Sequence, residues 1–134
     1  MTPFSLKIVT PDGLEYDGQA EEVIVRSTSG DIGILAGHVN CVAPLGMGRA
    51  TIIIDGQKRY AACIGGMLSV VDGKVTLVPT TFEWADEIDA ARVEASYEKA
   101  QRILHNKDAT NTEIKLAEAR LRRALVRRSV ASGK

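Results

Sequence analysis

The spacing of apolar residues along the chain changes once, near Trp84. Before this point, β-branched residues occur in short runs, and Asp55-Gly56 and Asp72-Gly73 each separate two such runs. An Asp-Gly pair supplies the two positive φ angles of a type I′ turn, so both pairs predict β-hairpins. After this point, apolar residues recur every three or four positions, as in an amphipathic helix. The sequence therefore predicts a β-domain at residues 1–85 and a helical part at residues 86–134.

The β-domain is expected to consist of several short strands joined by tight turns. Its runs of Val, Ile and Thr are bounded by Gly, Asp and Pro, which is typical of a sandwich or a barrel. The expected strands lie at residues 5–10, 20–28, 49–54, 57–64, 67–71 and 74–79.

Two helices are expected after residue 85. Asp86 is the expected N-cap of the first helix, and Thr110 and Glu113 have the spacing of a capping box at the start of the second. Because the connection at residues 105–109 is short, the helices should lie antiparallel. The apolar stripes are Ala90, Val93, Tyr97, Ala100 and Leu104 in the first helix, and Ile114, Ala117, Leu121, Ala124 and Leu125 in the second.

This two-helix hairpin is too small to hold a core of its own, so it must gain stability from the β-domain or from a partner. Its stripes contain several alanines, which bury little area at roughly 25 cal/mol per Å². We therefore expect weak docking and a movable element. No apolar run approaches the roughly 18 residues of a membrane span, and the start of the chain lacks the pattern of a signal peptide. The protein is expected to be intracellular.

Residues 28–48, TSGDIGILAGHVNCVAPLGMG, hold five of the glycines of the chain. Gly30, Gly33 and Gly37 have the spacing G-x-x-G-x-x-x-G, which fits neither the dinucleotide-binding motif nor the P-loop. No Gly-Lys-Ser/Thr follows them. We therefore expect these glycines to permit tight turns and close backbone approach rather than to bind phosphate.

The same stretch contains the groups of a thiol active site, namely Asp31, His38 and Cys41. In an extended segment, residues three apart point to opposite faces, so His38 is expected to point away from Cys41. Cys41 and Cys63 are too few and too far apart for a metal motif, and both are expected to be reduced and buried. A thiol enzyme is kept as an alternative, and no metal site is expected.

Positive charge is concentrated in the last helix, although the formal net charge of the chain is +0. Residues 1–84 carry 6 Lys/Arg against 9 Asp/Glu, residues 85–109 carry 4 against 6, and residues 110–134 carry 7 against 2. Such a helix is expected to face solvent or an acidic protein surface. A free-standing module that binds nucleic acid through this helix is the alternative, although the β-domain lacks a basic face and an aromatic stacking platform.

Taken together, these segments resemble one family, the epsilon subunit of the F-type ATP synthase, which is equivalent to the mitochondrial delta subunit. Residues 4–48 are similar to its opening, in which a first strand and a turn precede a segment of the type v-s-G-e-G-e-x-G-i-l-p-g-H-a-p. GDIGILAGH at residues 30–38 carries most of this specificity. Residues 65–70, GGMLSV, and residues 88–92, IDAAR, match later segments. The resemblance covers essentially the whole chain.

The resemblance implies a flattened β-sandwich of about ten strands followed by an antiparallel two-helix hairpin. It also implies a non-catalytic subunit of the rotating central stalk that couples the gamma subunit to the c ring during proton-driven ATP synthesis. The expected location is the cytoplasmic face of a bacterial inner membrane, as a peripheral part of the synthase. The implied c-ring interface is Ser29, Gly30, Asp31 and Ile32, and the implied gamma interface is Gly37, His38, Val39, Asn40, Cys41 and Val42.

In many relatives the helical hairpin extends toward the alpha and beta subunits and restrains ATP hydrolysis. The resemblance thus implies that Arg120, Arg122, Arg123 and Arg127 contact an acidic segment of a beta subunit. No cofactor is required, but some relatives bind ATP through an Ile/Leu-Asp-x-x-Arg-Ala motif. Ile88, Asp89 and Arg92 match this motif and are candidate nucleotide-binding residues, whereas Val93 stands where the motif has Ala.

Overall fold

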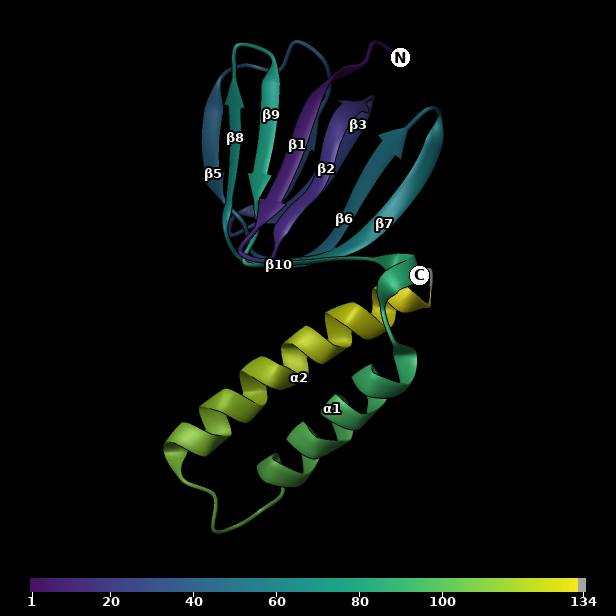
Figure 1. Cartoon of the computed structure of the whole chain (residues 1–134). Helices are drawn as coiled ribbons and strands as arrows, with labels where there is room; N and C mark the ends of the chain where they lie inside the picture. Colours follow the sequence, from purple (N-terminus) through teal and green to yellow (C-terminus); the bar gives the residue numbers. More distant parts are fainter. Residues whose placement is uncertain (133–134) are drawn as a thin grey trace. The chain divides into compact units, whose positions relative to one another are not determined.

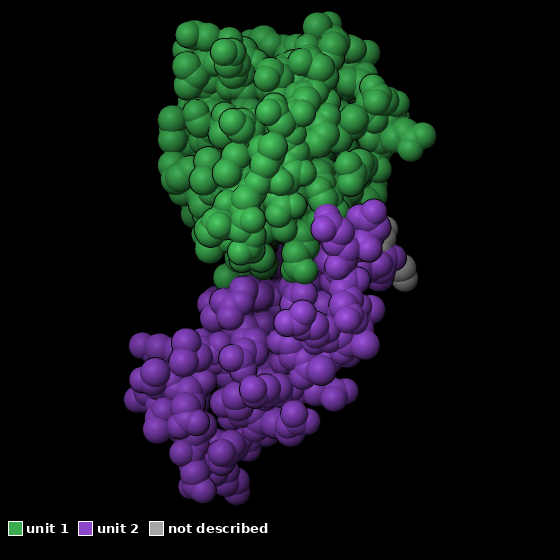
Figure 2. Space-filling model, viewed as in Figure 1, with its two compact units in different colours: residues 1–84 green, residues 85–134 purple. Residues whose placement is uncertain are grey.

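A computed structural model describes residues 1–132 of the chain. The chain divides into two compact units, Met1–Trp84 and a second unit that begins at Ala85 (Figure 2). Within the described residues, the first unit holds ten strands in two sheets, and the second holds a short 3-10 helix and two α-helices (Figure 1). The expected β-sandwich followed by two helices is confirmed.

Each sheet of the sandwich has five strands. The order is β2-β1-β9-β8-β5 in the first sheet and β10-β7-β6-β3-β4 in the second. Neighbouring strands are antiparallel except β1 and β9, which pair in parallel with Ser5 opposite Lys74. The strands are β1 (Phe4–Thr10), β2 (Gly13–Ala20), β3 (Glu22–Ser27), β4 (Gly30–Ile34), β5 (Cys41–Pro44), β6 (Met47–Ile54), β7 (Gln57–Ile64), β8 (Met67–Val71), β9 (Lys74–Val78) and β10 (Thr81–Trp84).

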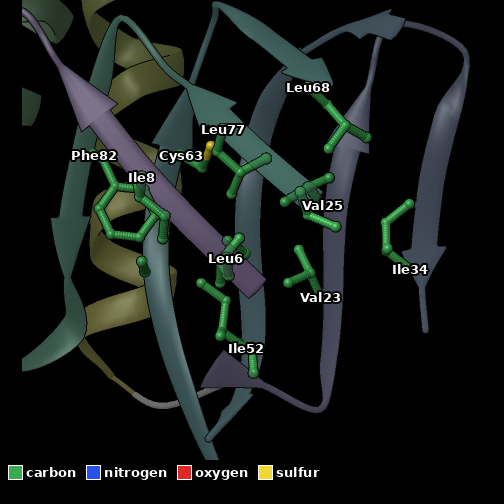
Figure 3. Packing of buried hydrophobic residues seen from close by; sticks show 14 of the residues in the cluster. Leu6, Ile8, Val23, Val25, Ile34, Ile52, Cys63, Leu68, Leu77 and Phe82 are labelled. Carbon is green, nitrogen blue, oxygen red and sulfur yellow. The ribbon is translucent and has the colours of Figure 1, made fainter. Parts of the chain in front are cut away.

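The core of the sandwich is built by every second residue of its strands. In β1, buried residues alternate with exposed or half-buried ones, because successive side chains point to opposite faces of a sheet. Aliphatic side chains from both sheets meet between the two layers, and each is fully buried (Figure 3). They include Leu6, Ile8, Leu68 and Leu77 from the first sheet and Val23, Val25, Ile34 and Ile52 from the second.

An aromatic cluster closes one border of this core. The ring of Trp84 packs edge-on against Phe82 at 4.9 Å and Tyr16 at 6.4 Å between centroids. The guanidinium of Arg59 lies over the Trp84 ring, 3.8 Å from its centroid, in a cation–π contact. Burial is the main cause that raises the pKa of Tyr16 above its ordinary value.

The tight turns follow the expected chemistry. Asp55 and Asp72 have φ angles of 52° and 49°, and the glycines after them also have positive φ, so the Asp-Gly hairpins are confirmed. Gly66 is more constrained, because its φ is +94° and a Cβ placed on it would lie 2.0 Å from the carbonyl oxygen of Val78. Only glycine fits this close approach of two backbones.

The second unit is a helical hairpin. Its elements are the 3-10 helix η1 (Ala85–Glu87), α1 (Ala90–Leu104) and α2 (Asn111–Ala131). The predicted capping box at α2 is confirmed, with reciprocal hydrogen bonds between Thr110 and Glu113. The predicted N-cap of α1 is wrong: Asp86 lies in η1, and Asp89 adopts the extended conformation and accepts the Arg92 N–H at 3.1 Å.

Small side chains fill much of the buried surface of the hairpin. Ala100 of α1 and Ala117 and Ala124 of α2 are buried. The expected α2 stripe is wrong at Leu125, which is 41% exposed, because the buried positions of α2 are Ala117, Ala124 and Val130 instead. The Arg128 guanidinium lies 4.3 Å from the centroid of the Tyr97 ring and 3.4 Å from the Glu94 carboxylate.

We expect Gly66→Ala to destabilise the sandwich by about 2–4 kcal/mol, because a methyl group would collide with the backbone of β9. At about 4–8 °C per kcal/mol, the midpoint of thermal unfolding should fall by more than about 8 °C. The matched control is Gly33→Ala, whose added Cβ would meet nothing within 4 Å. It should change the stability by no more than about 0.5 kcal/mol. Equal midpoints for the two variants would contradict this role of Gly66.

Candidate functional site

The two implied interfaces lie at opposite ends of strand β4. The residue pair Ser27 and Gly30 closes one end of the β3–β4 ladder, and Val23 and Ile34 close the other. The segment 29–32 is at the first end, and the segment 37–42 follows the second end and leads into β5. The first segment occupies the start of β4, and Gly33 and Ile34 complete the strand before the loop that leads to the second segment.

The turn at residues 27–31 is ordered by its own side chains. The Ser27 hydroxyl accepts the Ser29 N–H at 3.1 Å and donates to the Gly30 carbonyl oxygen at 2.6 Å. Asp31 forms an ion pair with Arg26 at 3.4 Å, and these side chains are 60% and 56% exposed. The Asp31 carboxylate is therefore held at the surface, where an exposed pair contributes only about 0–1 kcal/mol and can exchange partners.

The loop at residues 35–40 crosses from the second sheet to the first. Gly37 has a φ of 82°, and the His38 N–H donates to the Leu35 carbonyl oxygen at 3.2 Å, which forms a turn. The prediction that His38 points away from Cys41 is wrong: His38 Nδ1 lies 4.0 Å from Cys41 Sγ. The extended geometry assumed for this prediction does not apply, because the chain turns before β5 begins.

This proximity does not assemble a thiol active site. His38 Nδ1 lies 2.8 Å from the Val39 carbonyl oxygen, which can only accept, so this nitrogen carries the proton and cannot remove one from Cys41. Asp31 pairs with Arg26 at the other end of β4 and does not orient His38. The three candidate groups are therefore not brought together.

The two cysteines have different surroundings. Both thiols are free, as predicted, but only Cys63 is buried, whereas Cys41 is partly exposed. Burial raises the pKa of the Cys63 thiol to about 12, because the charged thiolate is unfavourable in the apolar core. Among the described residues, no group of three or more His, Cys, Asp or Glu side chains could hold a metal ion.

An apolar surface extends from the 37–42 segment across the outer side of the first sheet. Val39 and Val42 are 74% and 66% exposed. Val42 lies opposite Ser69 of β8, and the next pair on the same face of this ladder is Pro44 and Met67. We define the β5–β8–β9 face as the exposed apolar side chains Val39, Val42, Met67, Val71 and Val78.

Met67, Val71 and Val78 were not among the residues predicted from the sequence. The signal that could have found them is in β8 and β9, where apolar residues occur on both faces of the strand. A strand with one face in the core and one in water normally places polar residues outward. Apolar residues on the outward side indicate a surface that is covered by a partner.

The candidate residues of the helical hairpin occupy different environments. Asp89 caps α1, Arg92 is exposed and Ile88 is buried. In α2, Arg122 and Arg123 are exposed, whereas Arg120 and Arg127 are half-buried. No helix in the described part of the chain is long and apolar enough to cross a membrane.

Comparison with known families gives two matches that together span nearly the whole chain. Residues 3–85 match the family described as "ATP synthase, Delta/Epsilon chain, beta-sandwich domain". Residues 86–132 match "ATP synthase, Delta/Epsilon chain, long alpha-helix domain".

Curated relatives and solved structures agree with these matches. The chain is 41% identical over 135 residues to the ATP synthase epsilon chain of Ruminococcus albus, covering 100% of both chains. It is 44% identical over 131 residues to that of Bacillus velezensis, covering 98% of both. A chain of the Euglena gracilis mitochondrial ATP synthase structure has the same fold, with a TM-score of 0.78 and 22% identity over 91% of this chain and 77% of that chain.

We expect a thiol-alkylating reagent such as iodoacetamide at pH 8 to modify native Cys41 at least about tenfold faster than Cys63. The cause is the burial of Cys63 and its raised pKa, which leave almost no reactive thiolate. Mass spectrometry of the labelled chain measures both rates. Unfolding in guanidinium should equalise them, and Cys41→Ser should remove the fast reaction. Equal rates in the native chain would show that Cys63 lies outside the core.

Proposed function

The chain belongs to the ATP synthase delta/epsilon family, as an epsilon-type, non-catalytic subunit of the F1 central stalk, and we propose that it couples the gamma subunit to the c ring. Coupling requires two docking surfaces joined by a stiff element. The observation that carries the proposal is the placement of the 29–32 and 37–42 segments at the two ends of the hydrogen-bonded strand β4. Torque applied at one end is then transmitted through the packed sandwich.

The gamma subunit is the proposed partner of the β5–β8–β9 face and of the preceding residues Gly37, His38, Asn40 and Cys41. Exposed Val39 and Val42 provide apolar area, and Gly37 permits close backbone approach. Full burial of one Val, Leu or Met side chain stabilises a complex by about 1.5–3 kcal/mol. Several such contacts support lasting attachment, which a rotor subunit needs.

The c ring is the proposed partner of Ser29, Gly30, Asp31 and Ile32. This end differs from the β5–β8–β9 face, because its exposed side chains are the Asp31 carboxylate and the Ser29 hydroxyl, whereas Ile32 is half-buried. A polar surface of this kind fits polar loops that project from a membrane-embedded ring. In this proposal the subunit is peripheral at the cytoplasmic face of a bacterial inner membrane and requires no cofactor.

We propose a regulatory role for the hairpin, in which it extends toward the alpha and beta subunits. The alanine-lined contact between α1 and α2 supports this, since small side chains bury little area when the helices pack. Arg120, Arg123 and Arg127 share one side of α2, and Arg122 lies on another. An acidic segment of a beta subunit is the proposed partner of these arginines.

Nucleic-acid binding by the basic helix and ATP binding by the hairpin receive less support. The family match includes the basic helix, so we favour a protein partner over nucleic acid for it. ATP binding by Ile88, Asp89 and Arg92 stays a prediction, and the Asp89 carboxylate already accepts the Arg92 backbone N–H.

Asp31→Arg should weaken attachment to the c ring by roughly fivefold or more, because it replaces a surface carboxylate by a cation beside Arg26. The measurement is retention of the gamma-containing complex on c-ring vesicles, together with ATP-driven proton pumping. Asp108→Arg, which makes the same charge change in the helical connection, is the control and should leave both unchanged.

The double variant Arg26→Asp, Asp31→Arg distinguishes loss of a direct contact between Asp31 and the c ring from loss of the internal Arg26–Asp31 ion pair. It restores the internal ion pair but leaves a cation at position 31. Continued loss of attachment supports a direct role of the Asp31 carboxylate. Full recovery would show that only the internal pair matters, and unchanged attachment in Asp31→Arg would count against this interface.

Changing Arg120, Arg122, Arg123 and Arg127 to Gln should relieve inhibition of ATP hydrolysis by a purified catalytic core that carries gamma. Each exposed ion pair contributes only about 0–1 kcal/mol, so the effect should be collective and should weaken with salt. The matched control changes Lys99, Arg102, Lys107 and Lys115 to Gln, which removes the same charge. If the control relieves hydrolysis equally, net charge and not this set of arginines is responsible.

A further inference from the structure

One side chain joins two surface connections that are distant in sequence. The Asn40 carboxamide oxygen accepts the Asp72 backbone N–H at 2.8 Å, and its Nδ2 donates to the Asp72 carboxylate at 3.4 Å. Asn40 ends the 35–40 loop, and Asp72 is the first residue of the β8–β9 turn. We call this two-bond contact the Asn40–Asp72 clamp.

The clamp supplies hydrogen bonds to both the 35–40 loop and the β8–β9 turn. Asp72 is the first residue of a two-residue turn, so its N–H does not donate to a strand partner within the hairpin. Asn40 satisfies that donor. The hydrogen bonds of His38 with Leu35 and Val39 lie inside the 35–40 loop, and its 4.0 Å contact with Cys41 reaches only β5, so none of them attaches the loop to the β8–β9 turn.

The clamp also fixes the relative position of two side chains of the β5–β8–β9 face. Val39 precedes Asn40, and Val71 precedes Asp72, and both valines are exposed. Because neighbouring Cα atoms are only about 3.8 Å apart, a contact between Asn40 and Asp72 keeps these two valines close to each other. One apolar surface is thereby assembled from a loop and a sheet.

We propose that Asn40 is a positioning residue, which orders the 35–40 loop so that Val39 and Val71 form one docking surface. This inference rests on the proposed function in so far as the partner is the gamma subunit. Asn40 therefore contributes through the loop it holds, in addition to the direct contact with gamma that the family resemblance implies for it. Preorganisation of a docking loop increases affinity because less conformational freedom is lost on binding.

The chain offers a matched control at the other Asp-Gly hairpin. The Glu21 carboxylate accepts the Gly56 N–H at 2.5 Å, which is also a side-chain bond to the backbone of a tight turn. This contact holds the β6–β7 turn and none of the five side chains of the β5–β8–β9 face. Glu21→Ala should thus cost similar stability without changing the docking surface.

The first measurement is amide hydrogen exchange by NMR on the full chain alone. In Asn40→Ala, the Asp72 amide should exchange roughly three- to tenfold faster, as expected for loss of one hydrogen bond. Glu21→Ala should leave that amide unchanged. The Asn40→Asp, Asp72→Asn double variant exchanges donor and acceptor and should restore protection, because Asn tolerates positive φ.

The second measurement is the affinity for purified gamma subunit by titration calorimetry. Asn40→Ala should weaken binding roughly three- to tenfold, and the double variant should recover it, while Glu21→Ala binds normally. Unchanged Asp72 exchange, or unchanged affinity despite faster exchange, would overturn the positioning role. If the unaltered chain does not bind gamma, the proposed function fails, while the exchange rates still decide whether Asn40 orders the loop.

Discussion

Aliphatic side chains from the two sheets pack against each other in one apolar core, and the surfaces of the sandwich depend on that contact. Leu6 and Leu77 of one sheet and Val23 and Ile52 of the other are fully buried there. Because strand residues alternate between two faces, burial of one set fixes which side chains point outward. The same packing that stabilises the unit therefore also presents the β5–β8–β9 face.

The six strands predicted from residue patterns are the six interior strands of the two sheets. The four that these patterns missed, β2, β4, β5 and β10, are the four edge strands. Edge strands have one partner strand and tolerate glycine, proline and charged residues, so their apolar periodicity is weak. Gly30 and Gly33 in β4 and Pro44 in β5 illustrate this. Only the family resemblance indicated about ten strands.

Signals in which both partner residues can be read from the sequence predicted the structure well, and signals that also depend on the course of the chain or on the packing of a helix face did not. The Asp-Gly turns and the Thr110–Glu113 capping box involve neighbours in sequence and were confirmed. The N-cap at Asp86, the burial of Leu125 and the separation of His38 from Cys41 were wrong. The first and the third depended on where the chain turns, and the burial of Leu125 depended on which face of α2 packs inward.

The parallel pairing of β1 with β9 determines when the sandwich can become complete. Ser5 lies near the start of the unit and its partner Lys74 near the end, so the first sheet stays open at its centre until both are present. Contacts of such sequence separation close slowly, because the entropy of a long loop is lost before they form. During synthesis, β1 and β2 therefore form a hairpin with one unpaired edge as long as β9 is absent. Strand β9 closes that edge when it pairs with β1.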